Sequence, residues 1–360
     1  MLLLMRALPI ALVLILLTSL AAAAPEPTRE AFLKLLDRSR VDPAVQFDDD
    51  GSRFSFMSEK DERVPALLLK PATQPITAAQ RRPVVIALHG TGGTKESQLP
   101  VLRALAERGF LAIAIDARHH GERTKAGKGS DEYQQAILRA WREGGRDSAA
   151  PGDAQASRRA YPFFYDTVWD VMRLIDYLEI RDDVDPKRIG LIGTSKGGIE
   201  TYLAAAADER IAAAVPCIGV QSFRWALEHD AWQSRIGTIR TGFDAAAKQA
   251  GVVAPDATFV ANFYDRVAPG LAGEFDGPAM LPLIAPRPLL VMNGDSDART
   301  PLPGLKLCTD AAHAAYDKAG AADRFTVRIQ ENTGHKVTPE SRQAAIDWLV
   351  TVLNPVAVPK

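Results

Sequence analysis

Apolar positions along this chain fall into two kinds of pattern. Short continuous apolar runs, typical of strands buried on both faces, occur at 83–88, 110–115, 189–192, 211–218, 287–293 and 325–330. Longer stretches with helical spacing of apolar residues occur at 27–40, 98–108, 164–179, 303–319 and 339–353. Strands that alternate with helices of this length predict βαβ units. The fold class is therefore α/β, with a mostly parallel sheet and helices on both faces.

Three regions depart from this alternation. Residues 53–57 and 63–69 have the composition of two antiparallel strands. Residues 117–160 are long, charged and rich in glycine, with one helical piece near 133–141. Residues 221–285 have helical spacing and many aromatic side chains. Because this last segment follows a strand of the parallel sheet, we expect it to be a cap inserted above the carboxyl edge of the sheet.

The first 24 residues have the pattern of a secretory signal peptide. Arg6 supplies a positive charge, an apolar run extends to Leu20, and four alanines precede Pro25. The apolar run is nearly long enough to span a bilayer, so a membrane anchor is the alternative. The four alanines before Pro25 favour cleavage of this segment, and no second apolar span follows it. We therefore expect a secreted or periplasmic protein whose catalytic domain is 25–360.

The composition of the chain is consistent with a folded α/β protein and adds little to this prediction. Hydrophobic residues make up 47% of the 360 positions and charged residues 24%, enough for a sizeable core. The net charge of −1 gives no reason to expect nucleic acid or an anionic membrane surface as a partner. The two cysteines, Cys217 and Cys308, could pair in an exported protein. The apolar run around Cys217 favours buried thiols instead.

The run at 189–192 leads into the strongest chemical motif of the chain. It is followed by Gly193-Thr-Ser195-Lys-Gly197 and then by a helical stretch, which matches the G-x-S-x-G pattern of a nucleophile elbow. A serine that projects from so tight a strand-to-helix turn needs small neighbours. Ser195 is therefore the predicted nucleophile.

A serine hydroxyl needs a base, and the base needs an acid to orient it. His335 follows the last strand and is the predicted base. Asp295 and Asp297 both follow the strand at 287–293. We assign the acid to Asp297, which lies beyond the turn and before the stiffening Pro301, and expect Asp295 to cap its own turn. The chain order Ser195, Asp297, His335 is the one expected for this type of elbow.

An oxyanion hole would complete the site. The backbone N–H of Lys196 and that of Thr91, in the loop after His89-Gly90, are the predicted donors. His89 is expected to brace that loop. The pair His119-His120 has neither an H-E-x-x-H motif nor an acidic cluster beside it, so no metal is predicted. Trp225 and Trp232 are candidate substrate-binding residues, with helix core as the alternative.

These motifs resemble those of the α/β-hydrolase superfamily over most of the mature chain. The motifs are closest to bacterial dienelactone hydrolases and acetyl xylan esterases, and share features with prolyl-oligopeptidase catalytic domains. The supporting stretches are His89-Gly-Thr-Gly-Gly93, Asp116-Ala-Arg-His-His-Gly121, Asp185-Pro-Lys-Arg-Ile-Gly190, Gly193-Thr-Ser-Lys-Gly-Gly198 and Gly294-Asp-Ser-Asp-Ala-Arg-Thr-Pro301. The resemblance implies a cofactor-free serine esterase that acts through an acyl-enzyme on a small-molecule or polysaccharide-linked ester.

Two other functions are compatible with the same motifs. A serine peptidase of the prolyl-oligopeptidase type would share them, but only 28 mature residues (25–52) precede the first strands here. A non-catalytic ligand-binding protein could share the fold. The presence of serine, aspartate and histidine together argues against that reading. The acyl group, the alcohol and the oligomeric state are left open by the sequence.

Overall fold

The computed structural model describes residues 27–72, 81–124, 130–144 and 160–354. The predicted signal peptide at 1–24 lies outside these residues. None of the helices within them is both long and apolar enough to cross a membrane.

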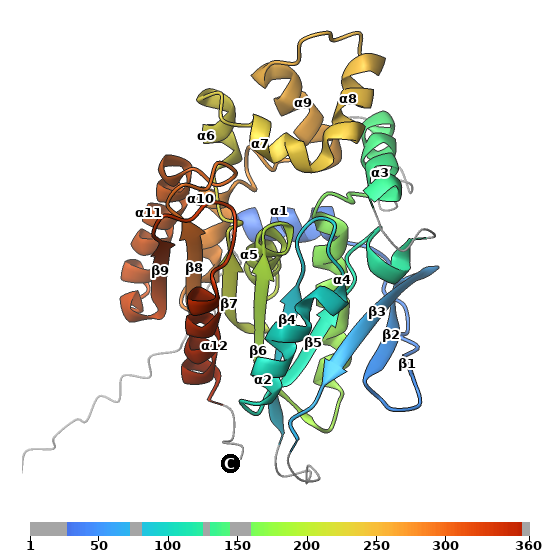
Figure 1. Ribbon diagram of the computed structural model, residues 1–360, viewed down its shortest axis with the longest axis vertical. Coiled ribbons are helices and arrows are strands. Elements are labelled where there is room, and N and C mark those ends of the chain that lie inside the picture. The colour runs from blue at the N-terminus through green and yellow to red at the C-terminus, as the bar shows by residue number, and fades with distance from the viewer. Residues whose placement is uncertain (1–26, 73–80, 125–129, 145–159, 355–360) are drawn as a thin grey trace, which may run out of the picture.

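The strands within the described residues form one nine-stranded sheet in the order β1-β2-β3-β5-β4-β6-β7-β8-β9 (Figure 1). Neighbours from β5 to β9 pair in parallel, whereas β1, β2 and β3 are joined antiparallel at one edge. The mostly parallel sheet predicted from the sequence is confirmed. The strands are β1 Gln46–Phe47, β2 Arg53–Glu59, β3 Glu62–Leu69, β4 Arg82–Leu88, β5 Leu111–Ile115, β6 Val184–Thr194, β7 Ile211–Cys217, β8 Leu289–Gly294 and β9 Phe325–Gln330. The sequence did not predict β1, because two exposed residues have no periodicity to detect.

Helices lie on both faces of this sheet. The α-helices are α1 Pro27–Leu36, α2 Leu99–Ala106, α3 Ser130–Glu143, α4 Tyr165–Glu179, α5 Lys196–Ala207, α6 Phe223–Glu228, α7 Gln233–Ile236, α8 Arg240–Gln249, α9 Ala257–Val267, α10 Gly277–Met280, α11 Leu302–Lys318 and α12 Pro339–Leu353. Short 3-10 turns occupy Lys95–Gln98, Gly121–Arg123, Gly237–Ile239, Leu281–Ile284 and Ala322–Arg324.

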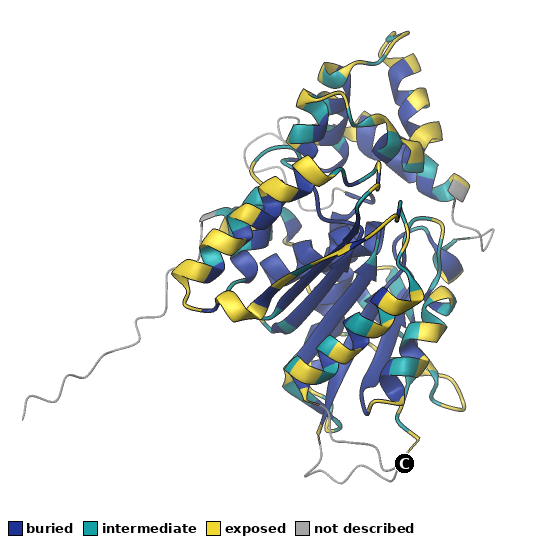
Figure 2. Cartoon of the chain, turned by 60° about the vertical axis from the view of Figure 1, so that its left-hand side comes forward, coloured by how far each residue is buried: buried dark blue, intermediate teal, exposed yellow. Residues whose placement is uncertain are grey.

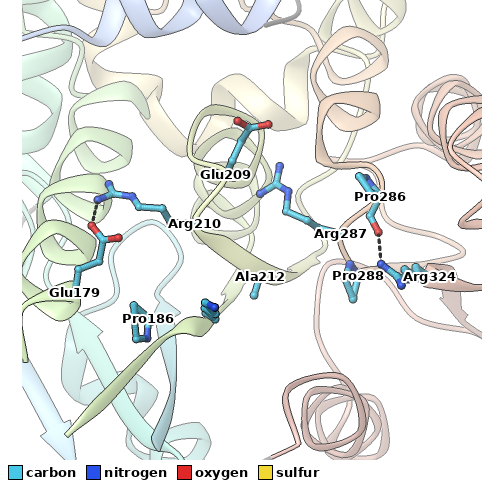
Figure 3. A pocket seen from close by; sticks show the side chains of 10 residues that line it. Glu179, Pro186, Glu209, Arg210, Ala212, Pro286, Arg287, Pro288 and Arg324 are labelled. Atoms are coloured by element: carbon cyan, nitrogen blue, oxygen red, sulfur yellow. Dashed lines mark hydrogen bonds and ion pairs between the residues drawn. The ribbon is translucent and has the colours of Figure 1, made fainter. Parts of the chain in front are cut away.

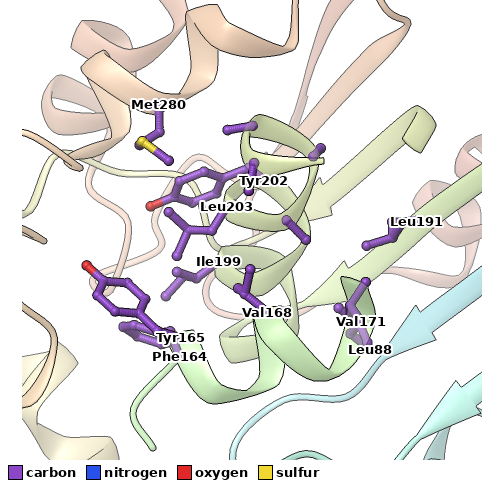
Figure 4. Close-up of a cluster of buried hydrophobic side chains, with 14 of the residues drawn as sticks. Leu88, Phe164, Tyr165, Val168, Val171, Leu191, Ile199, Tyr202, Leu203 and Met280 are labelled. Atoms are coloured by element: carbon purple, nitrogen blue, oxygen red, sulfur yellow. The ribbon is translucent and has the colours of Figure 1, made fainter. Parts of the chain in front are cut away.

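Alternate residues of each central strand belong to two different cores. In β4, Val84, Ile86 and Leu88 join the core formed with α1, α4, α5 and α11. The intervening Val85 and Ala87 join the core formed with α2 and α12. Figure 2 shows the central strands as almost wholly buried, and Figure 4 shows α4 and α5 contributing much of the first core. This double burial explains why the sequence of these strands is continuously apolar.

Helices α6 to α9 form a separate group above the sheet, together with α3 (Figure 1). Helix α3 joins this group through specific contacts: the Gln134 side-chain oxygen accepts from the N–H of Gly242 at 2.8 Å, and Arg266 Nε donates to the carbonyl of Trp141 at 2.6 Å. Residues from the two atypical regions of the sequence, 117–160 and 221–285, therefore pack against each other. We refer to α6–α9 as the upper helices.

Candidate active site

Ser195 occupies the turn between β6 and α5 in a conformation that is rare for a residue with a side chain. Its φ is +59° and its ψ is −114°. The turn is held because Ser195 N–H donates to the carbonyl of Cys217, at the end of β7, at 2.9 Å. A Cβ on Gly193 would collide with the carbonyl of Gly197, and one on Gly197 with the carbonyl of Leu88. Only glycine allows these segments to approach so closely, and such strain is a common property of functional sites.

Three predicted side chains meet at this turn. His335 Nε2 lies 2.7 Å from Ser195 Oγ. On the other side of the ring, His335 Nδ1 lies 2.8 Å from Asp297 Oδ2. The serine, the histidine and the aspartate come from the loops after β6, β9 and β8 respectively. A hydroxyl, an imidazole and a carboxylate in this order can transfer the hydroxyl proton to the imidazole while the carboxylate holds the ring.

Asp297 is suited to remain ionised in this arrangement. Its burial opposes the charge, but the hydrogen bond and charge of His335 and the N–H of Arg299 outweigh burial and lower the pKa of Asp297. The Arg299 N–H donates to Asp297 Oδ1 at 2.9 Å, so both carboxylate oxygens are engaged. Acceptance of Nδ1–H by this carboxylate leaves Nε2 of the neutral ring free to accept the serine proton.

Asp295 interacts with Ser296 of its own turn, as expected, and it also makes contacts that we did not expect. Its two oxygens accept the N–H groups of Thr333 at 3.0 Å and Asn332 at 2.8 Å. These two bonds are the main reason that the pKa of Asp295 is lowered. Asp295 thereby ties the loop after β8 to the loop that carries His335. The sequence could not reveal this partner, because 37 positions separate Asp295 from Asn332.

The predicted oxyanion donors lie on two adjacent segments. Lys196 is the first residue of α5. Thr91 follows Gly90, where an added Cβ would lie only 3.2 Å from the carbonyl oxygen of Thr194 and 3.4 Å from the Cβ of Ser195. An oxyanion hole requires two N–H groups beside the nucleophilic hydroxyl. The assignment of these donors to Lys196 and Thr91 stays a prediction.

His89 braces the loop that carries Thr91. Its Nε2 accepts the N–H of Ala117 at 3.1 Å, and its Nδ1 lies 2.8 Å from the carbonyl of Gly90. The ring must therefore carry its proton on Nδ1. Burial lowers the pKa of His89 to about 4, so the ring is neutral at physiological pH.

The Lys196 side chain points into the protein. Its ammonium pairs with Glu200 one helical turn later, and both side chains are buried. The ammonium also lies 6.0 Å from the centre of the Tyr133 ring. Burial raises the pKa of Glu200 to about 7, although the charge of Lys196 opposes this shift. Sequence reasoning missed Glu200, although its spacing of four residues from Lys196 was a visible signal.

The other histidines near the site have structural contacts. His120 Nδ1 lies 2.7 Å from the carbonyl of Arg118, and its ring packs on Tyr133 with centres 4.8 Å apart. Burial lowers the pKa of His120 to about 2. In the described part of the chain, no three His, Cys, Asp or Glu side chains gather as a metal site. Cys217 and Cys308 are buried free thiols, as the apolar surroundings of Cys217 indicated.

The two candidate tryptophans have different surroundings. Trp225 stacks on His229 with ring centres 4.5 Å apart and packs against Gly304 of α11. Trp232 packs near Phe243, and its buried Nε1 has no partner among the described residues. Neither contact set includes Ser195, and a substrate-binding role for either residue stays a prediction.

A surface cavity shown in Figure 3 belongs to the opposite edge of the sheet. It lies at the amino ends of β7 and β8 and has a volume of about 610 Å³. Its arginines are already engaged: Arg210 pairs with Asp208 and Glu179, and Arg287 donates to main-chain carbonyls. The chemistry described above is at the other, carboxyl edge, where ligands of open parallel sheets bind.

Comparison with known proteins agrees with this geometry. Residues 50–228 match the family of acetyl xylan esterase (AXE1), and residues 165–320 match the family of fungal glucuronyl esterase. The solved structure of acetyl xylan esterase 1 from Thermoanaerobacterium sp. JW/SL YS485 superimposes with a TM-score of 0.59 at 18% identity, covering 91% of this chain and 94% of that one. The chain has the fold of the α/β-hydrolases. At this identity the structural likeness concerns the fold.

Two curated proteins of Bacillus subtilis (strain 168) are similar in sequence. Putative hydrolase YtaP is 31% identical over 182 residues, which is 51% of this chain and 52% of YtaP. Putative esterase YitV is 26% identical over 277 residues, covering 75% of this chain and 89% of YitV. The match thus spans about half of the length of YtaP and most of that of YitV.

Proposed function

We propose that this α/β-hydrolase cleaves carboxylic esters through an acyl-enzyme formed on Ser195. The observation that carries the proposal is the continuous chain of contacts from Ser195 Oγ to His335 Nε2 at 2.7 Å and from His335 Nδ1 to Asp297 Oδ2 at 2.8 Å. Both matching families are named for esterases, which supports ester hydrolysis over peptide hydrolysis. The roles of the individual residues are part of the proposal.

The first half of the reaction forms the acyl-enzyme. Ser195 Oγ attacks the ester carbonyl carbon while His335 Nε2 takes the hydroxyl proton, and Asp297 stabilises the imidazolium through Nδ1–H. The carbonyl oxygen becomes an oxyanion, which the N–H groups of Lys196 and Thr91 bind. The carbon–oxygen bond to the alcohol then breaks, and His335 returns its proton to the departing alkoxide oxygen.

The second half releases the acid. A water molecule gives a proton to His335 and attacks the acyl carbon, and the resulting oxyanion occupies the same two N–H groups. When the bond to Ser195 breaks, the proton on His335 returns to Oγ and the carboxylic acid leaves. Every proton moves between groups of this chain, the substrate and water, so the mechanism uses no cofactor. The proposed substrate is a small-molecule or polysaccharide-linked ester.

We also propose that the protein is exported. The support is the charge of Arg6, the apolar run after it and the alanines before Pro25. N-terminal sequencing of the mature protein, recovered from the periplasm or the medium, should begin near Pro25. An intact Met1 on a membrane-bound product would contradict cleavage.

The nucleophile assignment is tested by Ser195→Ala. We expect kcat for 4-nitrophenyl acetate to fall by about 10⁵ to 10⁶, since removal of the serine from a comparable triad has an effect of that order. A fluorophosphonate probe should label the wild type and not the variant. Equal labelling of both proteins would contradict the assignment. Faster turnover of aminoacyl anilides than of esters would instead indicate a peptidase.

A further inference from the structure

The loop that carries the proposed acid, 295–300, is held near both of its ends by residues that follow the strands. At its end, Thr300 Oγ1 donates to Asn293 Oδ1 at 2.7 Å, and Asn293 Nδ2 donates to the carbonyl of Thr300 at 2.9 Å. Near its start, the N–H of Ser296 donates to the carbonyl of Thr333 at 3.1 Å. The middle of the loop, which follows Asp297 directly, has partners of a different origin.

These partners belong to the upper helices. Ser234 Oγ donates to the carbonyl of Ala298 at 2.6 Å, and Arg235 Nη2 donates to the carbonyl of Arg299 at 2.9 Å. Ser234 and Arg235 are consecutive residues of α7, and each is 64 positions away from its acceptor. Helix α7, above the carboxyl edge of the sheet (Figure 1), therefore holds the acid loop at two successive residues.

Arg235 is itself fixed by its surroundings. With the Gln221 amide oriented to satisfy both of its neighbours, its oxygen accepts from Arg235 Nε at 3.0 Å and its nitrogen donates to the carbonyl of Arg299. The guanidinium lies 5.8 Å from the centre of the Phe223 ring. Arg235 is only 3% exposed and Gln221 1%. Buried side chains in such a hydrogen-bond network have little freedom to move, so the Arg299 carbonyl that they hold is fixed as well.

Arg299 connects this network to the carboxylate of the acid. Its carbonyl is held by Arg235, and its N–H donates to Asp297 Oδ1 at 2.9 Å. The other oxygen, Asp297 Oδ2, lies 2.8 Å from His335 Nδ1. Charge acts in the same direction: burial lowers the pKa of Arg235 to about 10, and the charges of Tyr264 and Asp297 oppose this shift. A displacement of Arg299 would therefore be felt at the bond between Asp297 and His335.

We propose that Ser234 and Arg235 are positioning residues, which hold Asp297 in the geometry that orients His335. The inference rests on the proposed triad, but not on the substrate being an ester. Both residues act through Asp297 and not on the substrate. Displacement of a catalytic group by about 1 Å can slow a reaction by about 10²-fold, so contacts outside the reacting atoms affect the rate. The upper helices thereby complete the triad in addition to packing above the sheet.

The rate at which a fluorophosphonate labels Ser195 tests this role. With the probe in excess, the first-order rate constant does not depend on the amount of folded protein. Arg235→Met should lower it by about 10- to 100-fold, because bonds from a charged donor are lost. Ser234→Ala, a milder change, should lower it by about 3- to 10-fold. Arg240→Met, at an exposed position paired with Asp244, is the matched control and should keep the wild-type rate.

A double-mutant cycle with Asp297→Asn separates positioning from a general loss of structure. If Arg235 acts through Asp297, Arg235→Met should change the labelling rate by no more than about twofold in the Asp297→Asn background. A purely structural effect, or a direct contact with the probe, would lower the rate by the same factor in both backgrounds and would overturn the proposal. Wild-type labelling rates in both Arg235→Met and Ser234→Ala would also overturn it.

Ester hydrolysis by the same proteins separates this inference from the proposed function. If the variants slow labelling as expected but the wild type hydrolyses no ester, the esterase proposal fails and the positioning role stands. If the wild type hydrolyses esters but the variants are labelled at its rate, the esterase proposal stands and the positioning role is wrong. A wild type that the probe does not label would contradict both.

Discussion

The loops at the carboxyl edge of the sheet and the upper helices above them differ in whether their buried polar atoms have hydrogen-bond partners. In the loops, both oxygens of Asp297 are engaged, and both ring nitrogens of His89 have partners. In the upper helices, the Trp232 indole nitrogen and the Tyr264 hydroxyl have no partner among the described residues. The side chains that we propose for catalysis are therefore held in place by their neighbours, whereas these two donors of the upper helices are not.

Among changes to the loops, we expect Asp297→Asn to have the largest effect on turnover. The amide keeps the shape but leaves His335 in the wrong tautomer, and we expect kcat to fall about 10⁴-fold, as in serine proteases. The free energy of unfolding should change little. Steady-state kinetics with 4-nitrophenyl acetate and urea denaturation measure the two effects.

Asp295→Asn is the matched control two residues away. It weakens the bonds that the N–H groups of Asn332 and Thr333 donate to this side chain, so we expect a small loss of stability and turnover within about tenfold of the wild type. An inactive Asp295→Asn with an active Asp297→Asn would show that the acid is wrongly assigned.

The Lys196–Glu200 pair beneath the nucleophile is the exception on the loop side, since Glu200 Oε2 is buried without a partner among the described residues. The folded pKa of about 7 exceeds the ordinary 4.5, so the folded state binds the proton more tightly. Stability should therefore fall as pH rises from about 4.5 to 7, by on the order of 3 kcal/mol, and stay level above. Glu200→Gln should lack this decline in urea denaturation at pH 5 and pH 8.

Glu228→Gln, at an exposed position of α6, is the control and should retain the wild-type pH dependence. A decline of equal size in the wild type and in Glu200→Gln would assign it to other groups.

The smallest effect that we expect concerns the tryptophans of the upper helices. If 221–285 is a cap that selects the acyl group, Trp232→Ala should change the ratio of rates on hexanoate and acetate esters by roughly three- to tenfold. Trp225→Ala should change it less, because Trp225 packs on His229 and α11. A uniform loss on all chain lengths with a lower Tm would instead show that Trp232 is only core.

The sequence by itself determined the architecture and the identity of the residues that meet at Ser195. Continuous apolar runs identify β4 to β8 because burial on both faces removes polar positions, and polar residues just after parallel strands must share one edge. Gly193 and Gly197 predicted the turn that carries Ser195, because only glycine fits so tight a turn. What each side chain contacts was decided by tertiary structure alone. The bond from the Asn332 N–H to Asp295, the orientation of Lys196 toward Glu200 and the burial of Arg235 depend on segments far apart in the chain or on packing that no local pattern encodes. Burial and hydrogen bonding are properties of the assembled fold, so they became visible only there.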